Sequence, residues 1–170
     1  MLNTQTSREV GFIPISLFII FQRECLCMKK QDKEILREVQ KNANTGLLAI
    51  DAIMTNVSNK DMLRELSKQS TMYSDFYDRA TNQLEKVNER FYKNKDSKKI
   101  MMRSGIVMRT MMDHSNSHVA ELMIKGTNMG LLDMYKVMNH NKGASQNVHD
   151  LAKDMMDMEE KCITTLRDYL

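Results

Sequence analysis

The residues of this sequence that could carry chemistry gather in two short stretches. His114, His118 and Glu121 are spaced four and three residues apart, so on a helix their side chains share one face and could ligate a metal. Further along, Glu159 and Cys162 lie three residues apart beside a series of apolar positions. Iron, zinc or copper accepts such imidazole, carboxylate and thiolate ligands. These five residues are the candidate metal ligands.

The metal interpretation competes with a structural one. Two or three ligands from one helix leave a site incomplete, so the other ligands must come from facing helices. The first helical segment offers no carboxylate on its apolar stripe, because Asp51 lies beside the stripe and Asn42 is uncharged. The His-Glu-x-x-His signature of zinc hydrolases is also missing. We therefore interpret the paired histidines as a polar helix face, with metal binding as the alternative.

Methionine is the second candidate ligand, since the chain contains 17 methionines. Soft thioethers bind Cu(I), and Met108-x-x-Met111 near His114 has suitable chemistry for copper. Methionine also fills irregular cores and forms adaptable binding surfaces. Most of the methionines follow the apolar stripes, which favours core packing. Adjacent pairs such as Met111-Met112 leave one thioether off the centre of the stripe, so an adaptable dimer interface is the alternative to core packing.

Composition excludes several classes of function. The net charge is only +3 and the two signs are interleaved, which is typical of solvated helix surfaces and not of a nucleic-acid-binding stripe. Acyl-transfer triads, glycine-rich phosphate loops and dinucleotide fingerprints are missing. The three cysteines, Cys25, Cys27 and Cys162, form no disulfide framework and fit a reducing cytoplasm. We expect Cys162 to be a small buried hydrophobic residue.

The first 27 residues do not share the pattern of the rest. The apolar run of residues 10–21 is shorter than the roughly 20 residues that a transmembrane helix needs. It also lacks the positive leader of a secretory signal, because Arg8 is followed by Glu9. We interpret Met28 as the true start, with residues 28–170 as one domain. The alternative is a retained tail that targets the chain to a membrane.

Beyond Met28 the apolar positions recur at steps of three and four, which predicts an all-α fold. Short connections between long amphipathic helices predict an antiparallel four-helix bundle. Ser58 is the predicted cap of the second helix. The third helix is expected to be long and to kink or break near residues 126–130, where Gly126 and Gly130 weaken it. The expected helices cover residues 33–57, 60–91, 97–139 and 145–170.

A resemblance adds to this prediction. The stretches DHSNSHVAELMIKGTNMGLLD (residues 113–133) and MEEKCITTLRDYL (residues 158–170) resemble small uncharacterised bacterial proteins of ferritin-like bundle type. The likeness covers residues 33–170. Working ferritin-like proteins hold two metals with a glutamate from each of two helices and Glu-x-x-His from each of the other two. By this resemblance Glu121 and Glu159 match metal-binding glutamates, with Cys162 where histidine is expected.

The chain departs from that family pattern in two respects. Nothing on the first two helices matches a metal ligand, and the long crossover between the second and third helices needs residues 89–100 to unwind. The first hypothesis is therefore a non-enzymatic, ferritin-like bundle that binds a partner or serves as a scaffold, as a cytoplasmic homodimer. The alternative is a bundle that binds iron, zinc or copper through the five candidate ligands. Neither hypothesis involves nucleic acid, and membrane attachment requires the leader.

Overall fold

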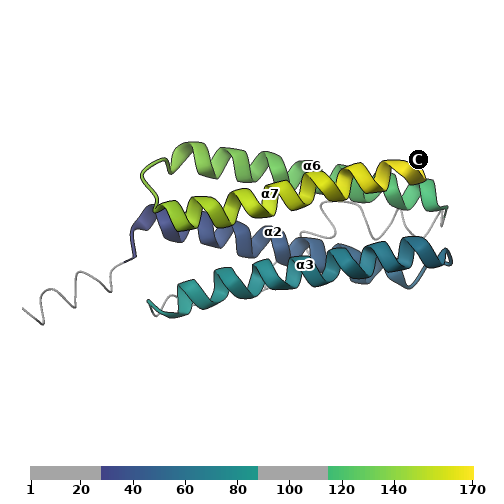
Figure 1. Ribbon diagram of the computed structural model, residues 1–170, viewed down its shortest axis with the longest axis horizontal. Helices are drawn as coiled ribbons and strands as arrows, with labels where there is room; N and C mark the ends of the chain where they lie inside the picture. Colours follow the sequence, from purple (N-terminus) through teal and green to yellow (C-terminus); the bar gives the residue numbers. More distant parts are fainter. Residues whose placement is uncertain (1–27, 88–114) are drawn as a thin grey trace, which may run out of the picture.

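The computed structural model describes residues 28–87 and 115–170, and all regular structure in these two ranges is helical (Figure 1). No strand occurs among these residues, so the predicted all-α helical bundle is confirmed. The leader, residues 1–27, lies outside the described residues. The elements are the α-helices α2 (Lys30–Met54), α3 (Lys60–Glu85), α6 (Asn116–His140) and α7 (Gln146–Leu166), and the short 3-10 helix η1 (Arg167–Tyr169).

Contacts between α2 and α3 define their relative direction. Gln40 of α2 donates a hydrogen bond of 2.8 Å to the hydroxyl of Thr81 in α3. Further along α2, Gly46 lies against the ring of Tyr73, which is earlier in α3. Residue numbers therefore rise on α2 as they fall on α3, and the two helices run in opposite directions.

α7 runs in the same direction as α2. At the start of α2, the carboxylate of Asp32 accepts hydrogen bonds from the backbone N–H (2.6 Å) and hydroxyl (2.5 Å) of Ser145, which precedes α7. Further along both helices, Asn42 of α2 contacts Glu159 of α7. In Figure 1, α3 and α6 both run in the direction opposite to α2 and α7. The end of α3 and the start of α6 therefore lie at opposite ends of the bundle.

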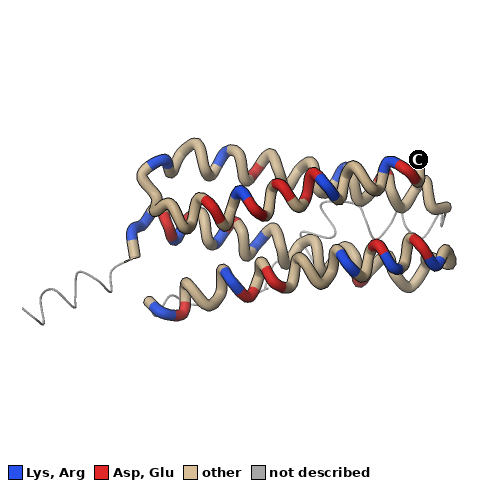
Figure 2. The backbone as a smooth tube through the Cα atoms, viewed as in Figure 1, with Lys and Arg blue, Asp and Glu red and all other residues tan. Residues whose placement is uncertain are grey.

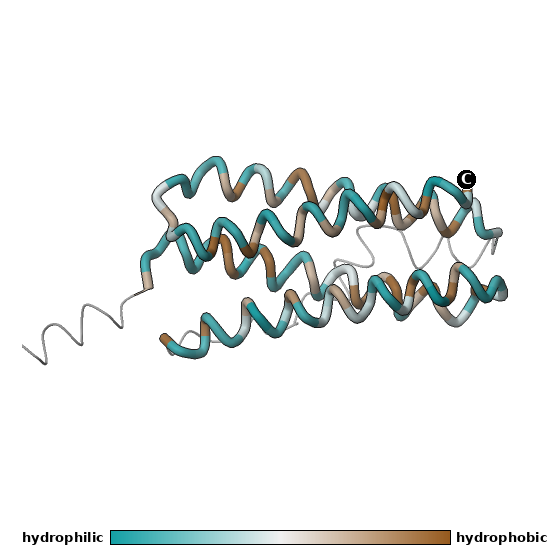
Figure 3. The backbone as a smooth tube through the Cα atoms, viewed as in Figure 1, coloured by the Kyte–Doolittle hydropathy of each residue, from teal (hydrophilic) through white to brown (hydrophobic). Residues whose placement is uncertain are grey.

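The core forms along the predicted apolar stripes of α2 and α7. These stripes contribute to one hydrophobic cluster that all four helices share, and the brown segments of Figure 3 mark its apolar residues. Burial of such stripes is what stabilises long amphipathic helices in a bundle. The predicted stripe residues that are buried are Leu36, Val39, Ala43, Ile50, Ile53 and Val57 before α3, and Val148, Leu151, Ala152, Met155, Met158, Cys162 and Leu166 on α7.

α3 is rotated slightly from its predicted orientation. The sequence pattern placed Leu63 and Tyr77 on the buried stripe, but both are only partly buried. Their neighbours Met62 and Phe76 are buried instead, together with Gln69. Leu66, Tyr73 and Ala80 are buried as the pattern predicts, so the buried face is displaced by less than the 100° that separates adjacent residues. The neighbouring helices decide between the two orientations.

The cap of α3 is Asn59 and not the predicted Ser58. The side-chain oxygen of Asn59 accepts hydrogen bonds from the backbone N–H groups of Asp61 (3.0 Å) and Met62 (2.9 Å). Asparagine is among the best N-cap residues because its short side chain reaches these unpaired donors. Asp61 lies in the first turn of the helix.

The described part of the predicted third helix is a single unbroken helix. α6 begins at Asn116, where the hydroxyl of Ser115 caps the helix by accepting a hydrogen bond from the backbone of His118. The part of the expected helix between residues 97 and 114 lies outside the described residues. α6 then continues as one α-helix through Gly126 and Gly130, so the break expected there does not occur. Intact backbone hydrogen bonding on both sides outweighs the cost of about 1 kcal/mol for each glycine.

Charges are distributed along all four helices. Figure 2 shows acidic and basic residues interleaved along the helices. This distribution agrees with the interleaving seen in the sequence. None of the helices in the described ranges combines the length and the apolar character needed to cross a membrane.

Candidate functional site

The candidate site is built around Glu159, a carboxyl group in the interior of the bundle. Its side chain projects from α7 and is fully buried, with 0% of its surface exposed. The amide of Asn42 in α2 donates hydrogen bonds to both of its oxygens, at 3.1 and 3.3 Å. The hydroxyl of Tyr73 in α3 lies 3.2 Å from Oε1. Three helices thus contribute one polar group each to a single buried cluster.

Burial sets the ionisation of this cluster. Removal from water raises the pKa of Glu159 from 4.5 to about 8, although the hydrogen bonds from Tyr73 and Asn42 lower it in part. Burial, followed by the charge of Glu159, raises the pKa of Tyr73 well above its ordinary value of 10. At neutral pH the carboxyl group is mostly protonated and the phenol is neutral. The centre of the bundle is therefore polar but close to uncharged.

Two glycines make room for the partners of Glu159. A Cβ atom at Gly46 would lie 2.7 Å from Cε2 and Cζ of the Tyr73 ring, and one at Gly130 would lie 2.8 Å from Nδ2 of Asn42. Real Cβ atoms do not approach other heavy atoms so closely. Gly46 and Gly130 are therefore structural requirements of the cluster. This explains why α2 and α6 each have a glycine at these interior positions.

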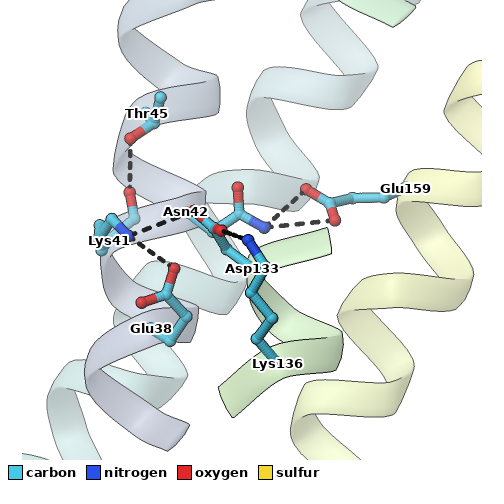
Figure 4. A network of polar contacts seen from close by, with 7 residues as sticks. All are labelled: Glu38, Lys41, Asn42, Thr45, Asp133, Lys136 and Glu159. Carbon is cyan, nitrogen blue, oxygen red and sulfur yellow. Dashed lines mark hydrogen bonds and ion pairs between the residues drawn. The ribbon is translucent and has the colours of Figure 1, made fainter. Parts of the chain in front are cut away.

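A groove of about 450 Å³ lies between α2 and α6, and Tyr73 contributes to its lining. One end is polar, because Lys41 pairs there with Glu38 (2.8 Å) and Asp133 (3.7 Å), as Figure 4 shows. The other end is apolar. Small residues along both walls keep the groove open. The apolar and small lining residues are Gly46, Ala49, Leu122, Met123, Gly126, Thr127, Met129 and Gly130.

The predicted ligands on α6 lie at the surface of the bundle. His118 Nδ1 lies 4.0 Å from a carboxylate oxygen of Glu121. Glu121 is exposed and also pairs with Lys125 one turn later. His118 Nε2 is buried, and it is the one buried side-chain nitrogen or oxygen within residues 28–87 and 115–170 that has no hydrogen-bond partner. The remaining predicted ligand of this face, His114, lies outside the described residues.

The predicted ligands on α7 are buried. Cys162 is in the core, as expected, and its sulfur lies 3.4 Å from the sulfur of Met158. Burial, with the charges of Glu65 and Glu159, raises the pKa of the thiol to about 12, so it is no nucleophile at neutral pH. Across the described ranges, no three His, Cys, Asp or Glu side chains come close enough together to hold a metal ion.

Sequence reasoning identified Glu159 but missed its partners. The sequence drew attention to Asn42 only as an uncharged residue of the first helix, and to Tyr73 as a stripe residue and one of the polar side chains that the second helix offers. The available signal was Gly46, a small residue on the stripe of α2 that indicates a close approach by something bulky. Comparison with protein-family models, with curated proteins and with solved structures finds no match for this chain.

Proposed function

We propose that this protein is a non-enzymatic helical bundle of ferritin-like topology that acts as a binding or scaffold protein and works as a homodimer in the cytoplasm. In ferritin-like bundles a long connection joins the second and third helices. Here α3 and α6 run in the same direction, so the end of α3 and the start of α6 lie at opposite ends of the bundle. α3 alone has 26 residues, which corresponds to about 39 Å at 1.5 Å per residue.

The observation that carries the proposal is the set of hydrogen bonds around Glu159. Metal-binding ferritin-like proteins carry a metal-binding glutamate on the last helix, and by the resemblance Glu159 matches it. In this chain the carboxyl group instead meets the amide of Asn42 and the phenol of Tyr73, which are both neutral donors. Hydrogen bonding thus takes the place of metal coordination in joining α2, α3 and α7.

A binding role is supported by the surface around α6. The groove between α2 and α6 is largely apolar, and the exposed side chain of Met129 stands at its edge. Exposed apolar surface of this kind marks interaction sites in proteins that are otherwise polar outside. The bundle therefore presents a rigid helical surface to a partner, while its interior is fully committed to packing.

One specific observation favours the second candidate, a metal-binding bundle. The buried nitrogen of His118 has no partner, and an imidazole nitrogen without a partner is able to ligate a metal. Glu121 is the nearest carboxylate to that ring. This candidate needs further ligands, for which the sequence offers His114.

Elemental analysis of the full-length protein, purified without added metal and again after incubation with iron, zinc or copper, separates the two candidates. The proposal expects well below one metal ion per chain in both preparations. Stoichiometric metal that disappears in a His118→Ala variant would overturn it. A Lys125→Ala variant is the matched control, because it alters the same face of α6 without removing a candidate ligand.

A further inference from the structure

The outward face of α6 is apolar at its centre. Met129 and Leu132 expose 64% and 55% of their surface, and Tyr135 exposes 49%. Within the described ranges, the remaining large hydrophobic residue with such exposure is Leu170 at the C-terminus. A surface helix normally keeps its outer face polar, whereas α6 has apolar residues on both its inner and its outer side. This face therefore has the composition of a helix that is covered on both sides.

Charged residues flank this apolar centre in a definite order. Glu121 and Lys125 come before it, and Asp133 and Lys136 come after it. Within α6 the first two form an ion pair, and the last two form another at 3.2 Å. Read from the opposite end, the order becomes base, acid, base, acid. A second α6 laid antiparallel over the first therefore sets each acid against a base, to within one residue along the helix.

We infer that a second copy of this chain docks on this face, with the two α6 helices antiparallel and centred between Asn128 and Met129. Glu121 then lies opposite Lys136 of the partner subunit, and the exposed methionines meet at the two-fold axis. The inference rests on the proposed homodimer and names its interface.

A second copy fits this face better than an unrelated partner, because the pattern is complementary to itself. A two-fold interface requires one surface patch to match its own rotated image. The charges of α6 satisfy this condition in the antiparallel arrangement. In a parallel arrangement Glu121 would face Glu121 of the partner subunit, and like charges would repel.

The interface is tested by sedimentation velocity of the full chain over a series of protein concentrations. The series reaches about 100 µM, well above the dissociation constants typical of specific protein complexes. The wild type is expected to be dimeric. A Leu132→Asp variant, which places a charge in the apolar centre, is expected to be monomeric over the same series. A Leu170→Asp variant, at the other exposed hydrophobic residue, is expected to remain dimeric. Circular dichroism of each variant confirms that it is folded.

The direction of the helices is tested by charge reversal. Glu121→Lys sets two bases against each other and is expected to raise the dimer dissociation constant by about tenfold or more. Adding Lys136→Glu to the same chain restores the opposite signs and is expected to recover the wild-type constant. A wild type that stays monomeric would overturn the homodimer itself. A dimer that persists in Leu132→Asp would overturn only this interface. A dissociation constant that Lys136→Glu fails to restore in the Glu121→Lys chain would overturn only the antiparallel order.

Discussion

Replacing Glu159 by glutamine tests whether the centre of the bundle is neutral. Glutamine has almost the shape of a protonated glutamic acid, and it can keep hydrogen bonds to Asn42 and Tyr73, but it carries no titrating proton. In the wild type the pKa of Glu159 is about 8 in the folded chain. In the unfolded chain it has the ordinary value of 4.5. Between these values the folded state holds a proton that the unfolded state has released.

The sign of the effect follows from this difference. Because the folded state binds more protons, its stability falls as the pH rises. The stabilisation is fully present below pH 4.5 and is lost as the pH rises through 8. From about pH 5 to about pH 7.5, the wild type is expected to lose about 3 kcal/mol of unfolding free energy at this one site. The two other titratable groups of the cluster, Tyr73 and Cys162, have raised pKa values and stay neutral throughout this range.

The assay is urea unfolding followed by helical circular dichroism at several pH values, for the wild type and for Glu159→Gln. The difference between the two proteins cancels every other titrating group. With rising pH the variant is expected to gain about 3 kcal/mol relative to the wild type. Asp157→Asn, an exposed position on the same helix, is the control and is expected to show no such trend. A difference between Glu159→Gln and the wild type that does not change with pH would refute the neutral centre.

Two further predictions concern the helices that surround the cluster. Gly46→Ala forces a Cβ atom against the ring of Tyr73 and is expected to cost about 1–3 kcal/mol of unfolding free energy. Gly126→Ala, where nothing lies within 4 Å, is expected to stabilise by about 0.5–1 kcal/mol, and equal effects of the two substitutions would contradict the packing described. Asn59→Ala is expected to cost about 1 kcal/mol through loss of the cap of α3. Ser58→Ala is expected to be close to neutral in the same urea titration, and the reverse order would place the cap one residue earlier.

The cap of α3 and the orientation of α3 show where pattern reasoning stops. Ser58 and Asn59 are both good capping residues, and only the backbone geometry selects the second. In the same way, apolar residues at both Met62 and Leu63 satisfy the helical period in two orientations. The continuity of α6 has a similar explanation. Glycine weakens an isolated helix, but at Gly130 it also allows the contact with Asn42, so packing recovers what propensity loses.

The candidate site divides in the same way between local and distant information. Residue types and spacing selected Glu159 and Cys162 as residues of interest, and both belong to the buried part of α7. Their chemistry depends on burial and on neighbours far away in the sequence, which no spacing rule contains. Glu159 is 117 positions from Asn42 and 86 from Tyr73. These long-range partners supply the hydrogen bonds of the buried carboxyl group.

The sequence by itself determined that this chain forms long amphipathic helices, because the period of its apolar residues and its shortage of glycine and proline are local properties. It also determined that no catalytic motif of a familiar kind is present. The tertiary structure decided which way the helices run, which side of α3 is buried, and that Glu159 meets an amide and a phenol in the interior. These features arise only when distant segments pack together, since burial and hydrogen bonding across helices are properties of the assembled bundle.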